Sequence, residues 1–225
     1  MLKGYFTKWE KTLWVLSVLL ITASFLMFDR VNYMKFMASL VGVTSLIFIA
    51  KGNPFGQILM IIFGLMYGVI SFSCAYYGEL ITYVGMTVPM SALSLSSWLK
   101  NPYKGNRSQV KINSVTKKDI VVMLILSFVV TFVMYFVLKF FGTASLIPST
   151  FSVTTSFVAV FLSFKRSPYF ALCYALNDIV LIILWILAVI KDTSYISVLV
   201  CFAVFLVNDL YSFVNWRRIK AGQKE

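Results

Sequence analysis

The amino-acid sequence predicts an all-α polytopic membrane protein with eight spans, arranged as a parallel 3+1+3 repeat of three-helix units plus an extra N-terminal helix. Hydrophobic residues make up 60% of the 225 residues and charged residues only 12%, about half the charged fraction of a soluble domain. The apolar residues form eight runs, most of them near the roughly 20 residues that cross a bilayer as a helix. Segments of the first half also reappear in the second half.

The eight predicted spans are separated by short polar segments. They lie near residues 12–28, 34–50, 55–76, 80–98, 120–138, 145–164, 169–190 and 195–214. The first run could be read as a signal peptide, but no small-residue cleavage site follows it, and seven further runs do. The chain has no histidine and its three cysteines stand far apart in sequence, so neither a metal nor another cofactor is expected.

The basic residues indicate the orientation in the membrane. If alternate loops face opposite sides, 16 Lys and Arg residues fall on the side of both termini and 4 on the other side. Cytoplasmic loops carry such an excess, so we expect a cell-membrane protein with both termini in the cytoplasm. The same bias accounts for the net charge of +12, and no nucleic-acid partner is needed. The polar segment 99–118 is expected to be a solvated connector, with contact to anionic lipid as the alternative.

Two hairpins and two span ends carry the repeat. Segments 51–54 (KGNP) and 165–168 (KRSP) lie 114 residues apart, and each places a proline at the start of a helix, where its missing N–H costs nothing. At an offset of 118, segment 88–98 matches 206–216. Both end in Trp followed by basic residues, which predicts anchors at the membrane interface. Parallel repeats of this kind occur in transporters, with the substrate held between the units.

The repeat divides the chain into five parts. They are an N-terminal helix outside the repeat (1–32), a first three-helix unit (33–99), a cytoplasmic loop with a linker helix (100–144), a second three-helix unit (145–216) and a cytoplasmic tail (217–225). Three crossings invert a unit and the linker helix restores its orientation, so both units point the same way.

Polar residues inside the spans are the candidate substrate-binding groups. Asp178 lies about 14 Å into its span at 1.5 Å per residue, close to the midplane, where an acid that faces lipid costs about 2.5–3.5 kcal/mol. Tyr174, Asn177 and Trp185 follow the same stripe of the helix. Such residues can also merely tie helices together or pack.

Further candidates come from two other spans. Asn208 and Asp209 lie in the cytoplasmic half of the last span, and Gln57 and Tyr67 lie in the third. The first unit has no acid at the matching positions. The carboxylates are therefore asymmetric, which is compatible with a site for one asymmetric ligand. Carboxylates, amides and aromatic rings suit a flat, hydroxylated molecule that can be cationic, such as a nucleoside-like vitamin. A phosphate would need Lys or Arg clustered inside the membrane, and there is none.

At these residues the sequence resembles the PnuC family of vitamin transporters, best known for nicotinamide riboside uptake and related in fold to the SWEET sugar transporters. The resemblance covers about residues 33–220. It rests on the two K-x-x-P hairpins, the Asn177-Asp178 pair before Trp185, and the N-D-L-Y ending of residues 208–211. It implies the 3+1+3 fold, a homotrimer in the lipid bilayer, and facilitated diffusion of nicotinamide riboside, with phosphorylation inside the cell trapping the substrate.

One departure leaves the substrate open. Riboside-transporting relatives carry W-x-x-W-x-x-N in this span, whereas this chain has Ala171, Tyr174 and Asn177 there. Thiamine, riboflavin and deoxynucleosides, attributed to other members of the family, are therefore alternatives. A membrane-embedded enzyme is a competing class, but Asp178 and Asp209 are the only mid-membrane carboxylates and histidine is absent, so we expect no enzyme. A non-transporting subunit is the third class, and it predicts a dispensable Asn177-Asp178 pair.

Overall fold

The computed structural model describes residues 4–73, 80–143 and 145–223, which form helices and one two-stranded hairpin. Residues 74–79, at the end of the third predicted span, lie outside the described residues. The elements are α1 (Lys8–Phe28), α2 (Tyr33–Ala50), α3 (Phe55–Ser73), η1 (Ile81–Thr87), α5 (Val88–Leu99), β1 (Pro102–Tyr103), β2 (Asn106–Val110), α6 (Lys117–Phe140), α7 (Leu146–Phe164), α8 (Tyr169–Val189), η2 (Thr193–Tyr195) and α9 (Ile196–Gly222).

Seven of the described helices are long and apolar enough to cross a membrane, and they coincide with seven of the eight predicted spans. The first begins at Lys8, four residues before its predicted start, because Thr7 and Glu10 form a capping box. The fourth predicted span, 80–98, is divided into the π-helix η1 and the 12-residue helix α5. Pro89 lies next to this junction, and because it has no N–H to donate, regular α-helical bonding is interrupted there.

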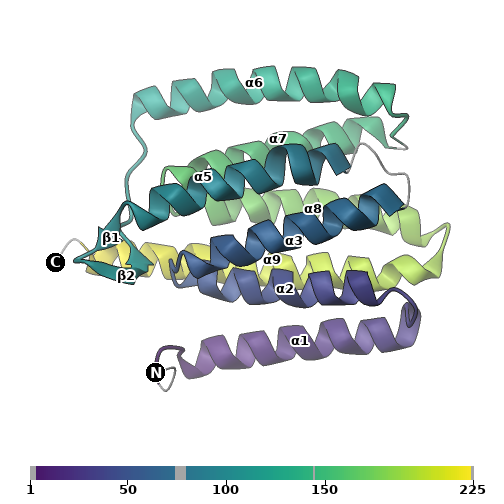
Figure 1. Ribbon diagram of the computed structural model, residues 1–225, viewed down its shortest axis with the longest axis horizontal. Coiled ribbons are helices and arrows are strands. Elements are labelled where there is room, and N and C mark those ends of the chain that lie inside the picture. Colours follow the sequence, from purple (N-terminus) through teal and green to yellow (C-terminus); the bar gives the residue numbers. More distant parts are fainter. Residues whose placement is uncertain (1–3, 74–79, 144, 224–225) are drawn as a thin grey trace.

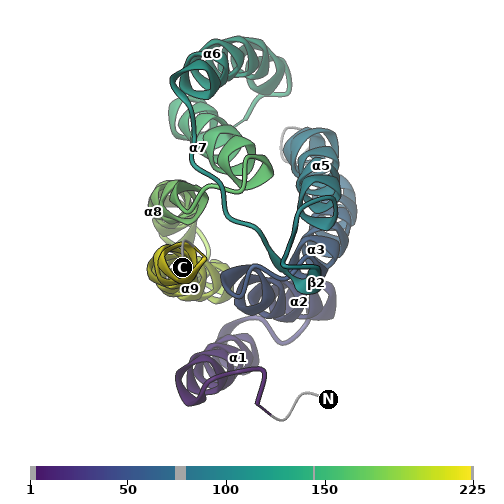
Figure 2. The same cartoon turned by 90° about the vertical axis from the view of Figure 1, so that its left-hand side faces the viewer.

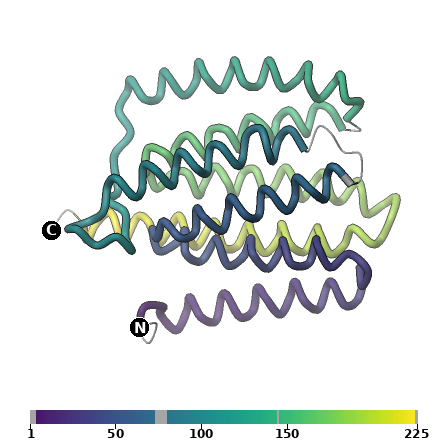
Figure 3. Tube along the Cα trace, in the orientation of Figure 1, coloured from purple at the N-terminus to yellow at the C-terminus, as the bar shows by residue number. Residues whose placement is uncertain are grey.

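The long helices run back and forth between two ends of the bundle (Figure 3). The start of α1, the end of α9 and the strand hairpin share one end, which we call the termini end (Figure 1), and the opposite end is the far end. Helices α7, α8, α9, α2, α3 and α5 follow one another around a ring, each packed against the next, and α5 packs against α7 to close it (Figure 2). Outside the ring, α1 packs on α2 and α9, and α6 packs on α7.

The segment after α5 is more than the solvated connector expected from the sequence. β1 and β2 pair as an antiparallel hairpin, and Val110 at the end of β2 is fully buried. The N–H of Val110 donates to the Gly52 carbonyl at 2.9 Å, and the N–H of Asn113 donates to the Arg166 carbonyl at 3.0 Å. Both acceptors are left-handed residues of the two K-x-x-P turns. One segment therefore fastens both turns at the termini end.

Candidate functional site

The candidate site lies in the middle of α8, a helix that is otherwise apolar. The helix follows Pro168, as the K-x-x-P pattern predicted. Its buried face consists of Phe170, Ala171, Ala175, Asn177 and Asp178. Asn177 and Asp178 are 6% and 4% exposed, so α8 keeps its one amide and its one carboxylate inside the bundle. This is the placement that the cost of a lipid-facing acid demands.

Asp178 meets a second acid, Asp209 of α9. The two carboxyl groups are close enough to influence each other electrostatically, and the Tyr174 side chain lies within reach of both. Both acids are buried, and one oxygen of each, Asp178 Oδ2 and Asp209 Oδ1, has no hydrogen-bond partner among the described residues. The ion pairs in the described part of the chain all involve other acids. Two acids side by side and away from water favour a cation, a shared proton or hydrogen-bond donors of a ligand.

The amide of Asn177 is held by α7. Its Oδ1 accepts a hydrogen bond from Ser152 Oγ at 2.8 Å and another from Thr155 Oγ1 at 3.0 Å. Neither hydroxyl was predicted from the sequence. The available signal was the stretch 149–156, in which six of eight residues are Ser or Thr, an unusual density of hydroxyl groups for a membrane-length helix.

Neighbouring side chains of α9 face different helices. Asn208 Nδ2 donates to Ser17 Oγ of α1 at 3.0 Å and to the Val204 carbonyl of its own helix at 2.8 Å. Its amide hydrogens therefore serve the contact between α9 and α1. Asp209 is rotated from Asn208 by about 100° around the helix and interacts with Asp178 on α8. Of the two candidates on α9, only Asp209 joins the acid pair.

Three other predicted residues extend toward the two ends of the bundle. Gln57 Nε2 donates to Ser163 Oγ of α7 at 3.3 Å, near the termini end. The ring of Tyr67 packs 5.0 Å from the ring of Tyr83 in η1. Trp185 packs against aromatic rings of η2 and α9 near the far end. Tyr174, Asp178 and Asp209 therefore interact with one another, while Asn177, next to Asp178 in sequence, is held by α7.

Three aromatic rings lie on the termini side of the acids, and we call Trp98, Phe170 and Trp216 the aromatic floor. All three are fully buried, and the Trp216 ring lies 5.1 Å from Trp98 and 4.7 Å from Phe170. Trp98 Nε1 donates to the Ser163 carbonyl at 2.9 Å, and Trp216 Nε1 donates to the Ile49 carbonyl at 2.8 Å. The prediction that these tryptophans are interfacial anchors is wrong. The last carbonyls of a helix need partners, and the two indoles reach them from inside the ring of helices.

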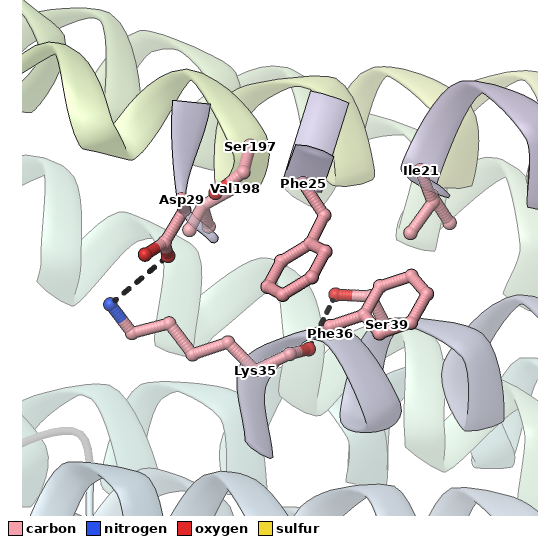
Figure 4. A pocket seen from close by; sticks show the side chains of 8 residues that line it. All are labelled: Ile21, Phe25, Asp29, Lys35, Phe36, Ser39, Ser197 and Val198. Atoms are coloured by element: carbon pink, nitrogen blue, oxygen red, sulfur yellow. Dashed lines mark hydrogen bonds and ion pairs between the residues drawn. The ribbon is translucent and has the colours of Figure 1, made fainter. Parts of the chain in front are cut away.

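A small cavity lies at the far end, where α1 and α2 meet the start of α9 (Figure 4). Lys35 Nζ and Asp29 Oδ2 pair across it at 3.8 Å. It is lined by Ile21, Phe25, Asp29, Lys35, Phe36, Ser39, Ser197 and Val198. Its volume of about 10 Å³ holds one water molecule, not a nucleoside. The described residues contain no group of three or more His, Cys, Asp or Glu side chains that could hold a metal ion.

Membrane-length helices around a buried polar site define a multi-pass membrane protein of the transporter type. Residues 32–218 match the Nicotinamide mononucleotide transporter family, and the chain belongs to this family. It is 25% identical over 221 residues to the Nicotinamide riboside transporter PnuC of Neisseria mucosa, an alignment that covers 96% of this chain and 83% of that relative. The predicted resemblance to the PnuC family is confirmed.

A solved structure shows the same fold. The chain matches the protein described as "Crystal structure of the Vitamin B3 transporter PnuC" with a TM-score of 0.82 at 21% identity, over 97% of this chain and 94% of that one. The expectation of an all-helical membrane transporter therefore agrees with the helices of the structure and with both relatives, each of which is named as a transporter.

Proposed function

We propose that this protein takes up nicotinamide riboside across the cell membrane by facilitated diffusion. The observation that carries the proposal is the buried pair Asp178 and Asp209, with an unpartnered oxygen on each carboxyl group. Nicotinamide riboside joins a cationic pyridinium ring to a ribose. The ring charge suits the two acids, the hydroxyl groups suit the free carboxyl oxygens and the Asn177 amide, and the Tyr174 ring offers a face for stacking.

The riboside suits this site better than the mononucleotide. A phosphate group calls for Lys or Arg donors, but α8 contains no basic residue and α9 contains none before Arg217. A phosphate beside Asp178 and Asp209 would add like charge without compensation. The family description names the mononucleotide and the Neisseria relative is named for the riboside. For this chain, the acid pair favours the riboside.

The 3+1+3 arrangement of two three-helix units, α2–α3–α5 and α7–α8–α9 joined by α6, is part of the proposal. Matched hydrogen bonds support it, because each donor lies 118 residues and each acceptor 114 residues from its counterpart. Ser97 and Trp98 donate to the carbonyls of Phe164 and Ser163, as Asn215 and Trp216 donate to those of Ala50 and Ile49. Gly52 and Arg166, also 114 residues apart, share a positive φ.

Movement of one unit against the other would expose the acid pair to each side of the membrane in turn. We place the termini end in the cytoplasm, where its excess of Lys and Arg belongs. The chain has no histidine, and α8 and α9 carry no lysine before Lys220, which supports passive transport. A proton carried by Asp178 and Asp209 themselves is the alternative. Phosphorylation inside the cell then traps the product, since a phosphate is unsuited to this site. By resemblance to its family, the protein assembles as a homotrimer.

Transport of a different nucleoside-like vitamin is the second candidate. Ala171 occupies the position of the first Trp in the W-x-x-W-x-x-N pattern and is fully buried. Neighbouring side chains therefore fill the space that the Trp ring would take. Tyr174 is then the aromatic residue that remains from the pattern. Thiamine, riboflavin and deoxynucleosides each present a flat ring to such a site.

Uptake by the purified protein in liposomes tests the proposal. We expect saturable entry of radiolabelled nicotinamide riboside and little competition from the mononucleotide, with Asp178→Asn as the impaired variant. Uptake of thiamine, riboflavin or a deoxynucleoside in place of the riboside would move the substrate to that compound. Uptake of none of them would favour a non-transporting membrane subunit.

A further inference from the structure

The contacts of Asn177 determine which hydrogen bonds it can offer a ligand. Ser152 and Thr155, three residues apart on one face of α7, both donate to its Oδ1. Its Nδ2 has no hydrogen-bond partner among the described residues, although the side chain is more than nine-tenths buried. Unlike Asp178 Oδ2 and Asp209 Oδ1, Nδ2 is not among the fully enclosed unpartnered atoms of the described residues, so it keeps some accessible surface at which a ligand can meet it. The amide is therefore anchored on one side and unfilled on the other.

We propose that Ser152 and Thr155 are positioning residues, which hold the Asn177 amide by its oxygen so that its NH₂ group donates to an oxygen atom of the substrate. This proposal deepens the transport function proposed above and rests on it. The unpartnered oxygens of Asp178 and Asp209 supply the complementary acceptors. A hydroxyl group can accept from the amide and donate to a carboxylate at once. The site thus selects a molecule that carries hydroxyl groups, as a ribose does.

The two hydroxyls constrain the amide unequally. Thr155 Oγ1 also lies within hydrogen-bond distance of the carbonyls of Phe151 and Ser152, at 3.1 and 3.0 Å. Its single proton serves one acceptor at a time. Ser152 Oγ has no other acceptor among the described residues, so its proton is committed to Asn177. Ser152 is the stronger constraint of the two, and its loss should have the larger effect.

Thr154, the residue before Thr155 on α7, provides a matched control. Thr154 Oγ1 lies 2.7 Å from Thr131 Oγ1 of α6, so its hydroxyl joins α7 to the helix outside the ring. Thr154→Val and Thr155→Val make the same chemical change at neighbouring positions of the same helix. A purely structural role of α7 hydroxyls predicts similar consequences for both, whereas positioning predicts that substrate affinity responds to Thr155→Val alone.

Riboside binding to the purified, full-length protein, measured by titration calorimetry, tests the proposal. Ser152→Ala should raise the Kd about fivefold, and Ser152→Ala with Thr155→Val about tenfold, as expected for the loss of an oriented hydrogen bond. Thr155→Ser keeps a hydroxyl and should retain wild-type affinity. Thr154→Val should leave the Kd unchanged. Maximal uptake in liposomes should change less than the affinity in every α7 variant.

A double-mutant cycle separates positioning from general damage. If the hydroxyls act through the amide, adding Ser152→Ala and Thr155→Val to Asn177→Ala should produce no further loss. Asn177→Asp tests the orientation. A carboxylate keeps both hydroxyl bonds but cannot donate. Binding of the uncharged reduced riboside, which gains nothing from the added negative charge, should therefore fall at least about tenfold.

Three results would overturn the proposal. They are an unchanged Kd in the α7 double variant, a loss in the Asn177→Ala background as large as that in the wild-type background, and full retention of binding of the uncharged reduced riboside by Asn177→Asp. A wild-type protein that binds thymidine and no riboside would instead contradict the proposed substrate. The same variants titrated with thymidine would then decide the positioning role separately.

Discussion

Replacing Asp178 by asparagine removes one acid of the pair while keeping the size of the side chain. Two unit charges about 4 Å apart interact by about 4 kcal/mol at an effective dielectric constant of about 20. Desolvation offsets part of this, and hydrogen bonds to charged groups typically contribute about 1.5–3 kcal/mol net. Because Asp209 remains, we expect the lower part of this range. The affinity for the riboside cation should therefore fall roughly tenfold to thirtyfold.

Proteoliposomes with imposed potassium diffusion potentials provide the assay. A cation entering an interior that is 100 mV negative gains about 2.3 kcal/mol per charge, so wild-type uptake of the riboside should rise with the potential. The reduced, uncharged riboside should show no such rise. It should also lose less affinity than the cation in Asp178→Asn, because asparagine keeps one oxygen that accepts a hydrogen bond from a hydroxyl group. Asp192→Asn is the matched control. Asp192 lies in the exposed turn before η2, so this substitution makes the same chemical change outside the site.

Two outcomes would refute this reasoning. One is riboside uptake that ignores the membrane potential and is equal in wild type and Asp178→Asn, which would reject a cationic ligand and point to a neutral nucleoside. The other is an equal loss of the charged and uncharged ligands in Asp178→Asn. In that case the carboxylate would act as a hydrogen-bond acceptor or as a packing element, without selecting charge.

Three further predictions follow from the topology, the aromatic floor and the proposed passive transport. A cysteine at position 108 (Ser108→Cys), on the exposed side of β2, should react with an impermeant thiol reagent only after cells are permeabilised; labelling of intact cells would contradict a cytoplasmic hairpin. Trp216→Phe should lower the unfolding free energy by about 1 kcal/mol because the indole N–H bond to Ile49 is lost, whereas Trp9→Phe at an exposed ring should have no measurable effect on the melting curve. Riboside should equilibrate without a pH or sodium gradient, and accumulation driven by either gradient would disprove passive transport.

The helices and the acid on α8 were predictable because single segments determine them. An uninterrupted apolar run of about 20 residues specifies a span, and an Asp in the middle of such a run must face the bundle. The K-x-x-P turns likewise fix where α3 and α8 begin. Pro89 also predicts the interruption of the fourth span. The prediction of one continuous helix there relied on the unbroken apolar run and did not weigh the proline.

Contacts between helices were not predictable from these patterns. Asn208 and Asp209 are adjacent in sequence, yet one faces α1 and the other α8, because neighbouring residues point about 100° apart around a helix. The direction of each depends on how α9 packs between α1 and α8. The tryptophans that end two spans show the same limit, since a rule for isolated spans does not include the helix carbonyls that Trp98 and Trp216 reach from inside the ring.

In the proposed repeat, packing accounts for the lack of an acid in the first unit opposite Asp178. Gly64 stands 114 residues before Asp178, and a Cβ atom there would lie 2.9 Å from Val88 Cγ2, closer than ordinary contact. The close approach of α3 to the start of α5 thus leaves no space for a side chain where α8 carries its carboxylate. An acid introduced at Gly64 would have to push the two segments apart.

The remaining matched positions follow the same division. Phe63, the counterpart of Asn177, packs its ring 5.8 Å from that of Phe205 on α9, and Ser91, the counterpart of Asp209, is fully buried. At these matched positions, a packed ring and a serine therefore stand where α8 and α9 carry an amide and a carboxyl group. A riboside carries its charge on one ring and its hydroxyl groups on the sugar, so it needs a one-sided site. Acids in both units would double the negative charge without a second cation to balance it.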